Sequence, residues 1–136
     1  MSKKIILVIL FSCATLFSSE SYYYSNNKKV YLTPVYTQTT NKVQALSMKK
    51  NIRYYQTSTN NILGVSNSII VNFMNLQNFD EIKSKYQLSM IKKLYGSVYI
   101  FEIRDNSKIF DIANRLYMEE NIKYAHPNFI KSVKKR

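Results

Sequence analysis

Cysteine, glycine, proline, histidine and tryptophan are scarce or absent in this chain of 136 residues, which contains one cysteine, two glycines, two prolines, one histidine and no tryptophan. The single cysteine, Cys13, excludes an intrachain disulfide and a cysteine-based metal cluster. One histidine adds no recognisable metal site. The isolated glycines, Gly64 and Gly96, exclude a glycine-rich phosphate-binding loop. We therefore expect neither a metal nor a cofactor.

Acidic residues are also few. The chain has 8 aspartates and glutamates against 20 lysines and arginines, for a formal net charge of +12. The lysines are spread over every segment and do not form the single stripe that is typical of nucleic-acid-binding proteins. The charge indicates attraction to an acidic partner or to an anionic envelope surface.

Catalytic motifs are missing as well. No serine lies in a Gly-x-Ser or Gly-Thr-Ser context, and the one histidine, His126, precedes a proline. Nothing supports a Ser-His-Asp arrangement. We predict that the protein is not an enzyme.

Residues 1–21 are predicted to be a signal peptide. Two lysines precede an apolar run at residues 5–17, which is too short to span a bilayer, and cleavage is expected after Ser19 or Ser21. Export to the periplasm or the extracellular space follows. A minor alternative makes Cys13 a lipoprotein cysteine, but the bulky neighbouring phenylalanine does not fit that pattern.

Residues 22–65 are predicted to form a small β-rich extension and linker. Strand-like runs at 22–24 and 28–32 flank residues that tolerate left-handed turn geometry, which indicates a hairpin. A polar linker follows, and then a second hairpin around residues 57–61, with Gly64 expected to interrupt its last strand.

Residues 66–130 have a cleaner pattern of alternating strands and helices. The predicted elements are a strand at 69–73, a helix capped by Asn75 or Asn78, strands at 90–95 and 98–103, a helix after Asp105, Asn106 and Ser107, and a strand at 122–125. This β-α-β-β-α-β order predicts an α+β, ferredoxin-like fold, with a four-stranded antiparallel sheet and both helices on one face.

The strand at 98–103 is apolar on both of its faces. Two helices on one side cover only one of them, so the other is either an exposed binding face or is covered by the extension at 22–65. The residues on this strand are Val98 and Ile100, which alternate with Tyr99, Phe101 and Ile103.

Several segments of this region resemble the N-terminal prodomain of subtilisin-like serine proteases, without the catalytic domain. The ending Tyr124-Ala125-His126-Pro127-Asn128-Phe129 is the most specific part of the resemblance, which spans roughly residues 66–130. The other segments are residues 69–73, the hairpin at 94–103 and residues 112–116.

The resemblance implies an inhibitor and intramolecular chaperone. In that family the open sheet face packs on two surface helices of the protease, and the C-terminal arm occupies the substrate cleft. The residues that we expect to contact the protease helices are Tyr99, Phe101, His126 and Asn128. The family commonly has acidic side chains at the last two positions, where they cap helix amino termini. Neutral His126 and Asn128 can still accept hydrogen bonds, whereas charged His126 would be repelled, so this sequence predicts looser and more pH-sensitive binding.

A basic arm, residues 131–136, ends the chain. The residues expected to lie in a protease cleft are Ile130, Lys131, Ser132, Val133, Lys134, Lys135 and Arg136. The alternative is a frayed, solvated terminus.

Two other functions stay open. The chain could be a non-catalytic remnant of an interrupted subtilase gene. It could also be a ferredoxin-like nucleic-acid-binding module, because residues 93–100 share a basic residue, an aromatic, a glycine and a valine with an RNA-stacking strand, in which Tyr95 and Tyr99 would contact bases. Ser97 stands where the second stacking aromatic is usual, which disfavours this reading.

Overall fold

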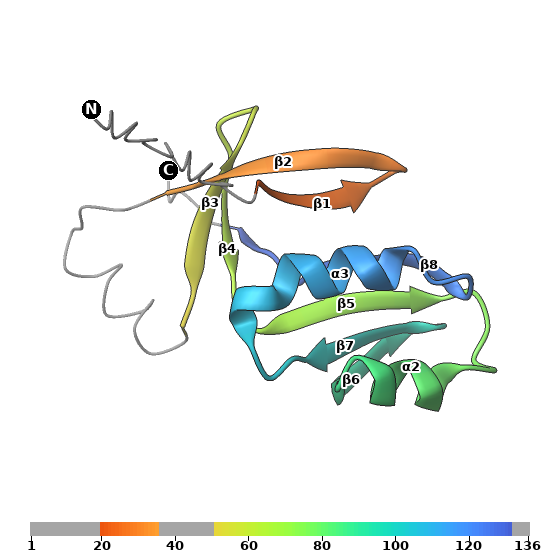
Figure 1. The fold of residues 1–136 in the computed structure, drawn as a ribbon. Coiled ribbons are helices and arrows are strands. Elements are labelled where there is room, and N and C mark those ends of the chain that lie inside the picture. Colours follow the sequence, from red (N-terminus) through yellow and green to blue (C-terminus); the bar gives the residue numbers. More distant parts are fainter. Residues whose placement is uncertain (1–19, 36–50, 132–136) are drawn as a thin grey trace, which may run out of the picture.

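The computed structural model describes residues 20–35 and 51–131, and these residues form nine strands, two short α-helices and one 3-10 turn (Figure 1). A five-stranded sheet has the order β1-β2-β3-β4-β9, and a four-stranded sheet has the order β6-β7-β5-β8. All neighbouring strands are antiparallel. The elements are β1 (Ser21–Ser25), β2 (Lys28–Pro34), β3 (Arg53–Thr57), β4 (Ile62–Val65), β5 (Ser68–Phe73), α2 (Phe79–Lys85), β6 (Ser89–Tyr95), β7 (Val98–Glu102), η1 (Asn106–Lys108), α3 (Ile109–Tyr117), β8 (Ile122–Pro127) and β9 (Ile130–Lys131).

The predicted ferredoxin-like fold, built on one four-stranded sheet, is wrong for this chain. The described residues are mostly β and form two antiparallel sheets of five and four strands, with only two short helices. The larger sheet consists of the segment that we expected to be a small extension, joined by the last strand, β9. Strand β9 pairs with β4 and satisfies backbone groups that β4 would otherwise present at a sheet edge.

Turn residues place the hairpins where the sequence predicts them. Asn26 and Asn27 link β1 to β2 with φ angles of 49° and 61°, and Gly96 links β6 to β7 with φ of 49°. Asn60, with φ of 61°, lies in the turn between β3 and β4. Asparagine and glycine tolerate this left-handed region, so these tight connections follow from local sequence.

We expected Gly64 to interrupt its strand, but it lies inside β4. It pairs with Ile130 of β9, and a Cβ atom added at Gly64 would lie 3.0 Å from Cγ2 of Ile52 and 3.3 Å from Cβ of Ile130. The missing side chain therefore allows β9 to approach β4 closely.

Replacing Gly64 by alanine is expected to weaken the β4–β9 pairing. Overpacking at this point should lower the free energy of unfolding by about 1–2 kcal/mol. It should also move the Ile130 methyl resonances toward their random-coil positions, as NMR would show. Ser58→Ala, in the exposed turn of the same hairpin, is the control. Unchanged Ile130 resonances in Gly64→Ala would contradict this account of the glycine.

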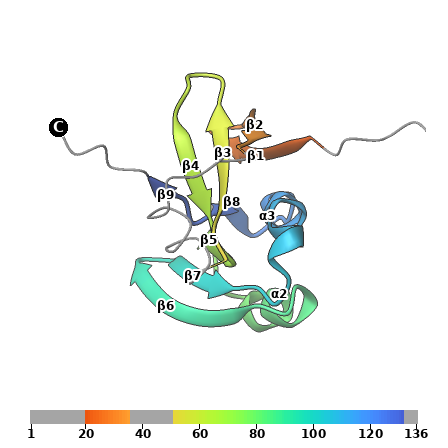
Figure 2. The same ribbon diagram turned by 90° about the vertical axis from the view of Figure 1, so that its left-hand side faces the viewer.

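Both helices cover the same face of the four-stranded sheet (Figure 2). The ring of Phe79 on α2 lies 5.0 Å from that of Tyr99 on β7, measured between centroids. From α3, Ile109, Ala113 and Leu116 are fully buried, at the helical spacing that the sequence predicts. Asp105 caps the 3-10 turn η1 that precedes α3, because its Oδ1 accepts a hydrogen bond of 3.0 Å from the backbone N–H of Ser107.

One hydrophobic cluster joins the two sheets. It includes Leu32, Tyr55 and Leu63 from the five-stranded sheet, together with residues such as Ile69 and Phe101 from the four-stranded sheet. The boundary predicted between residues 65 and 66 therefore falls within a shared core.

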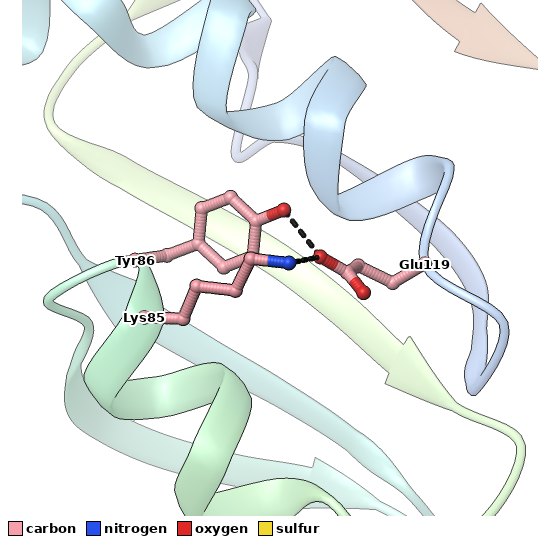
Figure 3. A network of polar contacts seen from close by, with 3 residues as sticks. All are labelled: Lys85, Tyr86 and Glu119. Atoms are coloured by element: carbon pink, nitrogen blue, oxygen red, sulfur yellow. Dashed lines mark hydrogen bonds and ion pairs between the residues drawn. The ribbon is translucent and has the colours of Figure 1, made fainter.

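The ends of the two helices are tied by a polar contact between Lys85, Tyr86 and Glu119 (Figure 3). Lys85 Nζ and the Tyr86 hydroxyl donate to the same carboxylate oxygen, Glu119 Oε1, over 2.6 Å and 2.5 Å. The hydrogen bond from Lys85, and then that from Tyr86, lower the pKa of Glu119 below its ordinary value.

Glu119→Gln is expected to lower the free energy of unfolding by roughly 0.5–1 kcal/mol at pH 7, because the ion pair is partly exposed. A lowered pKa in the folded state means that the carboxylate stabilises the fold above its ordinary pKa of 4.5 and loses this effect as the pH falls through the lowered value. Urea unfolding at several pH values should therefore show the difference between the two proteins shrinking below pH 4.5. The exposed neighbour in Glu120→Gln serves as control. A difference that persists unchanged at low pH would assign the effect to packing instead of charge.

Candidate functional site: the helix-free sheet face

Strand register defines the face of the four-stranded sheet that is opposite to the helices. Ile70 on β5 pairs with Ile100 on β7 and with His126 on β8, and Asn72 pairs with Val98 and Tyr124. Side chains of directly paired residues lie on the same face. We call this surface the helix-free face; its residues are Ile70, Asn72, Lys92, Tyr95, Val98, Ile100, Glu102, Tyr124 and His126.

The centre of the helix-free face is apolar. Ile70 and Ile100 are half-buried and adjacent, whereas Val98 is only 2% exposed. Burial, and then a hydrogen bond with the Tyr95 hydroxyl, raise the pKa of the Tyr124 hydroxyl. The two tyrosines come from the two edge strands of the sheet, so their hydroxyl groups meet across the central strands.

Tyr99 and Phe101, which we expected to contact a partner, lie on the face that the helices cover. They are 7% and 0% exposed, and the centroid of the Phe79 ring lies 5.0 Å from Tyr99 and 6.0 Å from Phe101. The partly exposed residue of β7 on the opposite face is their neighbour Ile100. Sequence alternation identifies the two faces of this strand but not which of them is covered, since both are apolar.

His126 lies on the helix-free face, at the outer strand β8. Its ring stacks on Tyr124, with a centroid distance of 5.6 Å and an interplanar angle of 16°, and on Phe129, at 6.1 Å and 7°. Its Nδ1 donates to the carbonyl oxygen of Pro127 over 2.9 Å, since a carbonyl can only accept. The other ring nitrogen, Nε2, is then the acceptor that a partner N–H group would use.

Asn128 follows β8 and is held against the start of β5. Its backbone N–H donates to the carbonyl oxygen of Ser68 over 2.9 Å, and its side-chain Nδ2 donates to Ser68 Oγ over 3.2 Å. The amide nitrogen is thus used within the chain, and the amide oxygen is the group that could accept from a partner.

The predicted cleft-binding arm begins inside a sheet. Ile130 and Lys131 form β9 and pair with Gly64 and Leu63, although both side chains are exposed. In this structure these two residues are therefore part of a sheet and not of a free arm. The other residues of the arm, at 132–136, lie outside the described part of the chain, as do residues 1–19 of the predicted signal peptide.

The N-terminal hairpin packs against α3 and β8, away from the centre of the helix-free face (Figure 1). Tyr24 stacks on Tyr117 of α3 with ring centroids 4.3 Å apart, and Tyr23 lies 4.6 Å from Phe129. Asn114 Nδ2 donates to the carbonyl oxygen of Tyr22 over 2.9 Å. The ring of Tyr23 also lies 6.4 Å from that of His126, so this part of the extension reaches the helix-free face at its β8 edge, while Ile70 and Ile100 are half-buried. Residues 36–50 of the predicted extension lie outside the described part of the chain.

No protein-family model, curated protein or solved structure matches this chain. Within residues 20–35 and 51–131, no group of three or more His, Cys, Asp or Glu side chains could hold a metal ion. The same residues contain no helix that is long and apolar enough to cross a membrane.

Proposed function

We propose that this chain is an exported, propeptide-like protein that binds a subtilisin-like serine protease and acts as its inhibitor, its folding chaperone or both. The observation that carries the proposal is the helix-free face, whose apolar centre, Ile70 and Ile100, stays partly open beside the ending Tyr124-Ala125-His126-Pro127-Asn128-Phe129. An open apolar sheet face is typical of a binding surface. In the family that the sequence resembles, this face packs on two helices of the enzyme.

The polar end of the same face suits helix amino termini. Asn128, through its amide oxygen, and neutral His126, through Nε2, would accept hydrogen bonds from backbone N–H groups at the start of the protease helices. Neither side chain supplies the negative charge that a helix dipole favours. The positive end of a helix dipole would repel a protonated His126, so binding through this side chain would weaken when His126 becomes protonated.

The arm has to leave β4 before Ile130 or Lys131 can enter a substrate cleft. The pairing to be broken is short, because β9 has two residues. The apolar face would dock first, and strand β9 would then exchange its pairing with β4 for pairing with the edge of the cleft.

The test is inhibition of a purified subtilisin-like protease from the same cell by the exported chain. We expect slow, tight inhibition, and a chain that lacks residues 132–136 should keep the fold but lose at least 10-fold in affinity. A truncated chain that inhibits as well as the full one would contradict the cleft arm while leaving the docking face in place. Absence of binding and of inhibition at micromolar protein would contradict the proposed function itself.

The nucleic-acid alternative finds no support in the geometry. Tyr95 and Tyr99 would have to stack successive bases on one surface. Tyr95 is 68% exposed on the helix-free face, whereas Tyr99 is 7% exposed beneath the helices. The two rings therefore cannot form a shared platform.

A further inference from the structure

Strand β6 is an exposed edge strand. In the described sheet it pairs only with β7, and all seven of its residues are exposed. Its outer edge therefore presents backbone N–H and C=O groups, although the register with β7 shifts at Ile91 and again at Leu94. Such an edge is a template for the addition of another strand.

The side chains of β6 combine apolar and basic groups. Natural edge strands are often protected by lysines and by bulges, and β6 has two lysines and two register shifts, but it also exposes large apolar side chains. Four of its seven residues are large and apolar: Met90 is 52% exposed, Ile91 55%, Leu94 37% and Tyr95 68%.

The two lysines of β6 point to opposite faces of the sheet. Lys92 pairs with Ile100 and lies on the helix-free face, whereas Lys93 pairs with Tyr99, with its Nζ 5.7 Å from the centroid of that ring. A strand added beside β6 would meet one positive charge on each of its faces. Glu102, the acidic residue of β7, pairs with Ser89 at the far end of β6 and does not neutralise them.

This charge pattern selects the partner. A second copy of the chain, paired antiparallel through β6 in a register centred on Lys92 or Lys93, would bring lysines opposite lysines at a cross-strand spacing where like charges repel. A strand that carries acidic side chains on both faces would neutralise both lysines, and its apolar side chains would cover Ile91 and Leu94.

We propose that the outer edge of β6 binds an extended acidic segment of a partner protein, which adds to the four-stranded sheet as a fifth strand. Main-chain hydrogen bonds would supply the attachment, and Lys92 and Lys93 the selectivity. The outer edge of β6 borders the helix-free face, to which Lys92 and Tyr95 belong, but the inference does not depend on the proposed function.

The probe is a fluorescein-labelled peptide of ten residues in which valine and glutamate alternate, titrated with the exported chain and followed by fluorescence anisotropy. We expect saturable binding. A peptide in which every glutamate is replaced by lysine should bind at least 10-fold more weakly. The valine–glutamate peptide N-methylated at alternate residues should also bind at least 10-fold more weakly, because it keeps its charges but cannot form main-chain hydrogen bonds along one edge. Equal binding of either peptide would overturn the proposal.

The matched variants separate the site from general charge attraction. Lys92→Glu combined with Lys93→Glu should weaken binding of the acidic peptide at least 10-fold. Lys28→Glu combined with Lys29→Glu makes the same change in net charge on exposed residues of β2. This second pair should change binding of the acidic peptide less than 2-fold. Circular dichroism checks that each variant is folded. An equal loss of peptide binding in the two double variants would overturn the proposal. A failure of every probe to bind would also overturn it, and the lysines would then serve to keep this edge unpaired.

Discussion

Phe101→Ala is expected to lower the free energy of unfolding by about 3–5 kcal/mol, which is a large part of the roughly 5–15 kcal/mol that stabilises a domain. Phe101 is fully buried, and its ring centroid lies 6.2 Å from that of Phe73 and 6.0 Å from that of Phe79. Removing the ring leaves a cavity between β7, β5 and α2, in a chain of only 136 residues.

Urea or thermal unfolding, followed by circular dichroism, measures this loss. The control is Met90→Ala, because Met90 pairs directly with Phe101 on the neighbouring strand and yet is 52% exposed. We expect the control to cost less than about 1 kcal/mol. Comparable losses at the two positions would contradict the assignment of Phe101 to the covered face.

Ile100→Asp has the largest expected effect on the proposed function. A charge at the centre of the helix-free face would be buried against the protease without a partner, so the inhibition constant should rise by roughly 100-fold or more. The fold should survive, because Ile100 is only half-buried in the free protein. Steady-state inhibition of the protease measures the effect, and Ile100→Thr, which keeps the β-branched shape, should give a smaller rise.

Tyr31→Asp is the control for this charge. Tyr31 is 52% exposed on β2, in the other sheet, so its replacement should leave inhibition within about 2-fold of the original protein. A folded Ile100→Asp protein that inhibits as strongly as the original would contradict docking through the helix-free face, whatever the behaviour of the arm.

The candidate site was only partly predictable. His126 is on the predicted face, because the register of β8 with β5 places it opposite Ile70. Tyr99 and Phe101, which the resemblance assigns to the contact with the protease, lie on the helix-covered side of their strand. Both faces of this strand are apolar, so the sequence alone does not distinguish a core position from a binding position.

The N-terminal segment was harder to place than the rest. Its hairpins were predictable from strand-like runs and from asparagines in the turns. Its assembly with β9 was not, since this pairing joins residues near position 64 to residues near position 130. Nothing in a two-residue strand distinguishes it from the beginning of a free arm.

Sequence alone determined the local elements of this protein: the asparagine and glycine turns, the buried stripe of α3, the strand β5 and the two alternating faces of β7. These depend on backbone preferences and periodicity, which act over a few residues. Tertiary structure alone decided which face of β7 is covered, where the N-terminal hairpin packs and where the chain's last described strand pairs. Those outcomes depend on contacts between segments that are distant in sequence. An apolar or aromatic side chain does not by itself specify which distant segment it packs against, so the choice is made only when the whole core is assembled.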